Sequence, residues 1–303
     1  MARRQRRSGG RRSITPWLIV ALVVVTAVVA YYIFTTAPAN QVNTSISTPV
    51  STQIMGYLTG VSDSTLNTVG LGPSTVSSPT SISAATTPLT SNGKPEVLYV
   101  GGEYCPYCAV ERWAMLVALS RFGNFSGVQY MLSSGTDTPP SVPTFTFAKA
   151  TYTSNYITFV AVEQYDRNNN PYQSVSTDQQ TLMKTYDSGG SIPFIDFGNK
   201  YIQTGSQFSP PMPVTGNWSA LAPLLNTPSS PVAGNVDGAA NRMISIICKL
   251  TSNQPAKVCS QTYAQVVSYV KLPSGMGQLA LSEVARATIG LEAIAPLRTI
   301  PRA

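Results

Sequence analysis

The chain has 303 residues, of which 43% are hydrophobic and 11% charged. This is long enough to bury a sizeable core, and the low charge excludes a highly charged disordered chain. Six of the 20 basic residues lie in the first 12 positions, so the rest of the chain holds 14 basic and 13 acidic residues. That balance excludes a basic face for nucleic acid, and no nucleic-acid partner is expected. The sequence contains no histidine, which excludes Ser–His and Cys–His nucleophile pairs and histidine-ligated zinc.

The N-terminus predicts a membrane anchor. A basic tail over residues 1–13 precedes an uncharged segment, and Trp17–Phe34 is a run of 18 apolar or near-apolar residues, close to the ~20 that cross a bilayer as a helix. We expect a single transmembrane helix over residues 14–36. The arginines favour a cytoplasmic N-terminus in the cell membrane, with the main domain outside the cytoplasm. The alternative is a cleaved signal peptide, because Ala37–Ala39 is a small-x-small site.

Residues 37–93 predict a linker. Residues 37–95 hold 22 Ser or Thr and six Pro but only two charged residues, a composition that buries little apolar surface. Within it, Ile54, Tyr57, Leu58 and Val61 have helical spacing, which predicts a short helical segment over residues 51–70 that docks on the main domain.

A cysteine pair lies at a predicted strand–helix junction. Glu96–Gly102 is apolar and ends in a glycine pair, which predicts a buried strand, and Ala109–Phe122 is rich in helix formers. Cys105-Pro-Tyr-Cys108 lies between them, with Pro106 suited to the first helical turn. A helix N-terminus favours a thiolate at Cys105, and Cys108, one turn later, can attack a mixed disulfide. The pattern therefore predicts a redox-active cysteine pair.

Further predicted elements complete an α/β pattern. Residues 127–133 and 155–165 predict strands, and residues 178–187 predict a helix capped near Thr177 or Asp178. A strand over residues 191–197 begins with an Ile–Pro step and returns through residues 200–204. Over roughly Pro95–Gly205 this order resembles the thioredoxin superfamily. The segment of residues 93–123 is similar to an uncharacterised archaeal family of membrane-anchored thioredoxin-like proteins.

The resemblance implies a thioredoxin-like α/β fold over residues 94–230, in which a central mixed sheet is flanked by helices. It implies that Pro193 is cis and faces the cysteine pair, and that Ile192 offers backbone groups to a substrate strand. By the same resemblance, the substrate surface includes Tyr104, Pro106 and Tyr107.

The chain also departs from the thioredoxin pattern. Tyr104 replaces the tryptophan that precedes the first cysteine, and Tyr99 replaces a buried acid. Glu96, Glu103 and Glu111 are therefore alternative candidates for proton relay. Residues 134–154 are an insertion, for which we expect a surface loop rather than a substrate lip.

Residues 231–303 predict a helical extension, with helices over Val236–Leu250 and Val258–Val270 and an amphipathic packing helix over residues 278–294. Cys248 and Cys259 lie near the facing ends of the first two. Outside the cytoplasm they predict a structural disulfide. Two alternatives stay open, namely a second shuttle pair and a zinc site made of all four cysteines.

These patterns favour a membrane-anchored extracytoplasmic thiol–disulfide oxidoreductase, an oxidase or isomerase rather than a reductase. Cys105 forms the mixed disulfide, Cys108 resolves it and Pro193 shapes the client groove. The expected partners are client proteins with thiols or disulfides and a membrane redox partner, and no cofactor or metal is expected. The alternatives are a non-catalytic envelope or interaction protein with purely structural disulfides, and a copper(I)-delivery protein.

Overall fold

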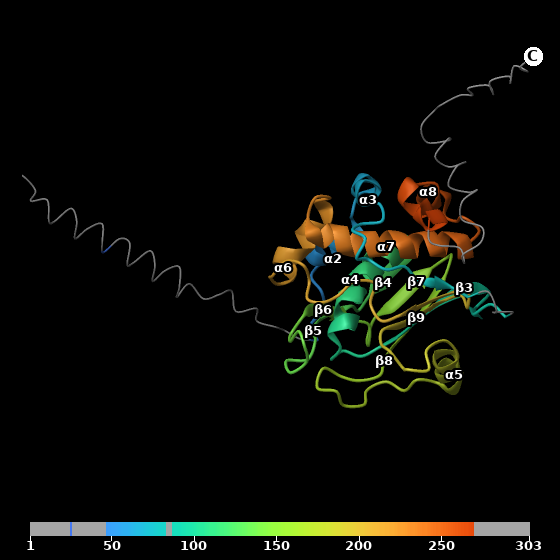
Figure 1. Cartoon of the computed structure of the whole chain (residues 1–303), viewed down its shortest axis with the longest axis horizontal. Helices are drawn as coiled ribbons and strands as arrows, with labels where there is room; N and C mark the ends of the chain where they lie inside the picture. The colour runs from blue at the N-terminus through green and yellow to red at the C-terminus, as the bar shows by residue number, and fades with distance from the viewer. Residues whose placement is uncertain (1–24, 26–46, 83–86, 270–303) are drawn as a thin grey trace, which may run out of the picture. The chain divides into compact units, whose positions relative to one another are not determined.

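The computed structural model describes Val25 and residues 47–82 and 87–269 (Figure 1). The described residues from 47 onward form one compact unit. The expected transmembrane segment, apart from Val25, and the helix expected over residues 278–294 lie outside the described residues. Among the residues that are described, no helix is long and apolar enough to cross a membrane.

Two short helices, α2 (Thr52–Thr59) and α3 (Asp63–Val69), begin the unit. The hydroxyls of Ser51 and Ser62 accept hydrogen bonds from backbone N–H groups in the first turns and so cap both helices. Of the residues with helical spacing, Ile54, Leu58 and Val61 are buried, whereas Tyr57 is half-buried. The expected helical segment over residues 51–70 is thus two docked helices separated by a short break.

Six strands form the central sheet within the described residues: β1 (Thr80–Ser81), β2 (Thr90–Ser91), β3 (Lys94–Gly101), β8 (Thr158–Glu163), β9 (Phe194–Phe197) and β10 (Tyr201–Thr204). β3 pairs in parallel with β8 and antiparallel with β9, and β10 and β1 continue the sheet beyond β9. β2 forms a hairpin with the start of β3. The expected central mixed sheet is confirmed, and it includes β1 and β2 from the segment expected to be linker.

Helices cover both faces of this sheet (Figure 1). α4 (Pro106–Leu119) and α7 (Pro231–Leu250) lie on one face, and α5 (Thr177–Tyr186) lies on the other. Side chains on alternate strand positions, among them Leu98, Val100 and Phe194, form a buried cluster on the α5 face. The N-cap of α5 is Ser176, one residue before the earliest expected position.

The segment between α4 and β8, which includes the insertion of residues 134–154, is largely folded into strands. It forms two hairpin-like pairs, β4 (Gly123–Ser126) with β7 (Thr151–Ser154) and β5 (Gln129–Leu132) with β6 (Pro143–Thr146). Phe145 and Thr144 are fully buried, and the Thr144 hydroxyl donates to the Ala109 carbonyl of α4 at 2.6 Å. The expectation of a surface loop therefore holds for residues 134–141, none of which is buried or in a strand, and was wrong for residues 143–154, which include β6 and β7.

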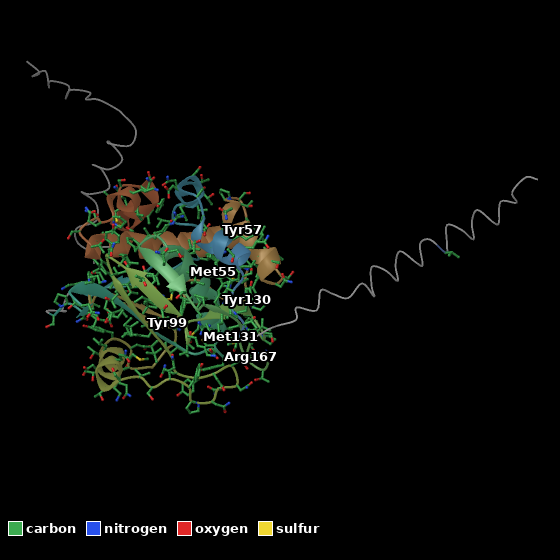
Figure 2. All side chains as sticks on the ribbon, turned by 180° about the vertical axis from the view of Figure 1, so that it is seen from behind. Met55, Tyr57, Tyr99, Tyr130, Met131 and Arg167 are labelled. Carbon is green, nitrogen blue, oxygen red and sulfur yellow. A yellow bond between two sulfur atoms is a disulfide. The ribbon has the colours of Figure 1, made fainter. Side chains whose placement is uncertain are left out.

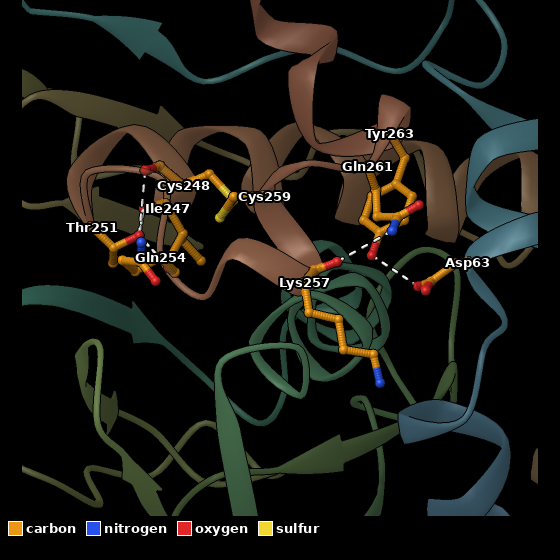
Figure 3. Close-up of a disulfide and its surroundings, with 9 residues drawn as sticks. All are labelled: Asp63, Ile247, Cys248, Thr251, Gln254, Lys257, Cys259, Gln261 and Tyr263. Carbon is orange, nitrogen blue, oxygen red and sulfur yellow. Dashed lines mark hydrogen bonds between the residues drawn. A yellow bond between two sulfur atoms is a disulfide. The ribbon is translucent and has the colours of Figure 1, made fainter.

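The C-terminal described part is helical: α6 (Trp218–Leu221), a 3-10 turn over Ala222–Asn226, α7, α8 (Ala256–Cys259) and a 3-10 helix over Thr262–Tyr269. α7 begins five residues before the expected Val236, at Pro231, where Ser230 caps it. The single helix expected from Val258 is instead interrupted after Cys259. There the Tyr263 hydroxyl donates to Asp63 and the Tyr263 N–H donates to Asn67, which ties this segment to α3 (Figure 3).

Cys248 and Cys259 form a disulfide between the end of α7 and α8 (Figure 3). Both cysteines are buried. Two of the four thiols that a four-cysteine zinc site would need are therefore bonded to each other. Among the described residues, no group of three or more Cys, Asp or Glu side chains is arranged to hold a metal ion.

Candidate functional site

The junction between β3 and α4 places the cysteine pair. Tyr99, labelled in Figure 2, is fully buried, and a side chain at Gly101, the last residue of β3, would collide with the Tyr99 hydroxyl. Cys105 is the N-cap of α4, and Pro106 occupies the first turn, where its missing N–H is not needed. The sequence thus delivers Cys105 to the N-terminus of a 14-residue helix.

Cys105 and Cys108 are both free thiols, and both are buried. The Cys105 Sγ accepts a hydrogen bond from the Cys108 backbone N–H at 3.2 Å and donates to the Ile192 carbonyl at 3.8 Å. Ile192 is half-buried, and the bond between it and the buried Pro193 is cis. The structure therefore brings together the four residues that sequence reasoning assigned to the sulfur chemistry.

The two thiols differ in acidity. Hydrogen bonding from the Cys108 side chain lowers the pKa of Cys105, burial opposes this, and the Cys108 N–H and the positive charge of Arg112 lower the pKa further. Burial raises the pKa of the Cys108 thiol well above its ordinary value. Cys105 is therefore the better nucleophile of the pair, because its pKa is lowered and it is slightly exposed. Cys108 is fully buried, and its pKa is raised.

This difference predicts selective alkylation. With a small alkylating reagent, we expect Cys105 to react with a pH midpoint below the value of an ordinary thiol, about 8.5. Cys108 should react much more slowly at the same pH, because it is fully buried and its pKa is raised. Mass spectrometry of each cysteine against pH measures both. A Cys105 midpoint at or above that of an ordinary thiol, about 8.5, would contradict the assignment.

Tyrosines surround the entrance to Cys105. Tyr107 is 46% exposed, whereas Pro106 is buried beside it. The ring of Tyr104 packs edge-on against Tyr165 at 5.9 Å. Tyr165 in turn lines a groove of about 530 Å³, whose other lining residues include Val175 and Met183 and extend to Gly190, two residues before Ile192. Neither cysteine is among the residues that line this groove.

The three carboxylates considered as proton relays point elsewhere. Glu103 accepts a hydrogen bond from the Thr146 hydroxyl at 2.6 Å, and Glu111 accepts one from the Gln207 N–H at 2.8 Å. Glu96 lies near the start of β3, at the opposite end of the strand from Cys105. No contact between any of these carboxylates and either thiol occurs among the described residues.

Sequence reasoning missed the charged pair behind the cysteines. Arg112 and Glu163 are fully buried, and Nε and Nη2 of Arg112 donate to the two carboxylate oxygens at 2.9 and 2.7 Å. One signal for Arg112 was available: it and Glu111 are the two charged residues of a helix that is otherwise almost entirely apolar. Glu163 carried no such signal, since it comes from a strand 51 residues away.

Comparison with protein families gives one match. A model of a domain of unknown function, DUF929, matches residues 80–190. The match includes both cysteines, Arg112 and Glu163, and it ends before Pro193. Searches of curated proteins and of solved structures found no similar protein.

Proposed function

We propose that the protein is a membrane-anchored, extracytoplasmic thiol–disulfide oxidoreductase that acts through Cys105 and Cys108, as an oxidase or isomerase. The observation that carries the proposal is the position of the Cys105 sulfur. It lies at a helix N-terminus, between the Cys108 N–H and the Ile192 carbonyl, where a thiolate is favoured and a neighbouring backbone can receive an extended client.

The fold supports a thioredoxin-like assignment. β3, α4 and β8 form a parallel strand–helix–strand unit, and α5 leads into the antiparallel pair β9 and β10, which extends the sheet on the other side of β3. Of the strands expected over residues 127–133 and 155–165, the second is β8 in this sheet, whereas the first is β5, which pairs with β6 outside it. The pairs β4–β7 and β5–β6 are inserted between α4 and β8.

The proposed oxidation transfers two electrons. A client thiolate attacks Sγ of Cys105 in the Cys105–Cys108 disulfide, the bond between the two cysteines breaks, and its electron pair stays on Cys108. A second client thiolate then attacks the client sulfur of this mixed disulfide. The client gains a disulfide, Cys105 leaves as a thiolate, and the protein ends as a dithiol. A membrane redox partner would reoxidise it.

The proposed location rests on the sequence. The arginines of residues 1–13, followed by the apolar segment of residues 14–36, favour an anchor with the domain outside the cytoplasm. The Cys248–Cys259 disulfide is compatible with an oxidising compartment. In that setting, disulfide formation or reshuffling in secreted clients is the chemistry favoured.

A redox titration of the full chain, with alkylation read at each cysteine, tests the proposal. We expect Cys105–Cys108 to equilibrate between about −120 and −270 mV, the range of working exchangers. Cys248–Cys259 should stay oxidised throughout and serves as the internal control. If Cys105–Cys108 also stays oxidised below about −300 mV, both pairs are structural and the non-catalytic interaction protein becomes the better account.

A further inference from the structure

The buried ion pair of Arg112 and Glu163 needs an explanation beyond stability. Both side chains are fully buried, one on α4 and the other at the end of β8. Removing two charges from water costs several kcal/mol for each ion, so a buried pair contributes little net stability compared with apolar residues of similar size. What the pair does provide is a positively charged guanidinium that Glu163 holds in a fixed orientation.

The Arg112 guanidinium is oriented toward the cysteines. Arg112 lies one helical turn after Cys108, and side chains on a helix lean toward its N-terminus. Nη2 of Arg112 also donates to the Gly102 carbonyl at 2.7 Å, in the loop that precedes Cys105. The guanidinium therefore extends back along the first turn of α4. Its remaining nitrogen, Nη1, is buried and has no hydrogen-bond partner in the part of the chain that the structure describes.

The surroundings of Cys108 are otherwise unfavourable to negative charge. Burial raises the pKa of Cys108, as do its hydrogen bond with Cys105 and the charge of Glu163, whereas Arg112 lowers it. Tyr99 on β3 interacts electrostatically with both cysteines, and its hydroxyl is buried with no hydrogen-bond partner among the described residues. The Arg112 guanidinium lies 5.8 Å from the centre of the Tyr99 ring. Tyr104 contributes a phenol from the preceding loop. Arg112 is thus the compensating charge for a thiolate at a fully buried position.

We propose that Arg112 is a positioning residue, held by Glu163, that places a positive charge behind Cys108 so that its sulfur can leave and attack as a thiolate. This rests on the proposed function and adds the group that makes its buried step feasible. When a client opens the disulfide, the electron pair stays on Cys108 beside the guanidinium. In the reverse step, the Cys108 thiolate attacks Sγ of Cys105, the bond between the two cysteines forms, and the client leaves as a thiolate.

A colour-forming disulfide isolates this step without any client protein. The full chain, reduced at Cys105–Cys108, is mixed with 5,5′-dithiobis(2-nitrobenzoate). Cys105 attacks first and releases one thionitrobenzoate, and Cys108 then attacks Sγ of Cys105 and releases the second. The rate of the second release, measured against pH, reports the Cys108 thiolate.

Three variants, which remove or keep a charge at defined positions, test whether Arg112 stabilises the Cys108 thiolate. Arg112→Met combined with Glu163→Gln removes both charges together and so leaves no unpaired buried carboxylate. We expect it to slow the second release at least about tenfold near pH 7 and to raise its pH midpoint by about one unit or more. Arg112→Lys keeps the charge and should retain most of the rate. Arg121→Met removes an arginine from just beyond the other end of α4, paired there with Asp63, and should behave like the wild type.

The two proposals fail in different ways. An unchanged rate and midpoint in the double variant, with its circular dichroism preserved, would overturn the role of Arg112 and leave the exchange chemistry standing. So would an Arg112→Lys variant that folds and loses the rate as fully as the double variant. If the wild type itself shows no second release, Cys108 does not resolve a mixed disulfide and the proposed function falls instead.

Discussion

The Cys108→Ser variant is expected to accumulate as a mixed disulfide with its client through Cys105. Cys105 keeps its position at the helix N-terminus, with the Ile192 carbonyl and the N–H of residue 108 as hydrogen-bond partners. A serine hydroxyl cannot resolve the bond that Cys105 forms, so the covalent intermediate should persist. Incubation of the reduced variant with a disulfide-containing peptide, followed by mass spectrometry without reductant, measures the adduct.

The matched control is Cys105→Ser, which leaves Cys108 as the remaining free thiol of the pair. Because Cys108 is fully buried and its pKa is raised, this variant should form at least about a hundredfold less adduct in the same time. Equal trapping by the two variants would show that the assigned order of the cysteines is wrong. Absence of an adduct with either would count against exchange chemistry altogether.

The second large expected effect is that Glu111 changes how the free energy of unfolding depends on pH. Burial raises the pKa of Glu111 from 4.5 to about 8, so the folded state binds this proton more tightly than the unfolded chain does. The stabilising contribution is fully present below about pH 4.5 and is lost as the pH rises through about 8. Glu111→Gln should therefore raise the free energy of unfolding at the alkaline end and change it little near pH 4.

Asp237 on α7 offers an independent second site. Burial raises its pKa well above the ordinary value, with the charge of Arg121 opposing this, and neither carboxylate oxygen has a hydrogen-bond partner among the described residues. Asp237→Asn should likewise raise the free energy of unfolding at alkaline pH and so weaken its dependence on pH. Asp178→Asn, which alters an exposed carboxylate on α5, is the control. Denaturant unfolding of each variant at several pH values measures the free energy of unfolding. If this free energy depends on pH in the same way in Glu111→Gln and in the wild type, the raised pKa of Glu111 does not affect stability and the prediction is refuted.

The parts of the fold that could be predicted are those specified by neighbouring residues. β3 and α4 follow from an apolar run, a glycine pair and a proline in the first helical turn, all within residues 94–119. α5 was expected over residues 178–187 from local capping signals, although its cap is Ser176, in a capping box with Gln179, rather than Thr177 or Asp178. Such signals act over a few residues, so they can be read without knowing the tertiary structure.

The missed parts depend on distant partners. Thr144 and Thr146 are polar residues in a turn-rich segment, and only packing against α4 and Glu103 explains their burial in β6. The interruption after Cys259 depends on contacts with α3. The pairing of Arg112 with Glu163 arises because β8 lies parallel to β3 and ends beside α4. None of these partners could be assigned from spacing in one sequence.

The most direct test is a single-turnover oxidation of a reduced peptide with two thiols by the full chain carrying the Cys105–Cys108 disulfide. The reaction is followed by mass spectrometry of both partners under anaerobic conditions. The account predicts that each peptide loses two hydrogens as one Cys105–Cys108 pair becomes a dithiol, with Cys248–Cys259 intact, and that Cys105→Ser leaves the peptide reduced. A peptide that stays reduced with the wild-type protein, or is oxidised equally by Cys105→Ser, would contradict it.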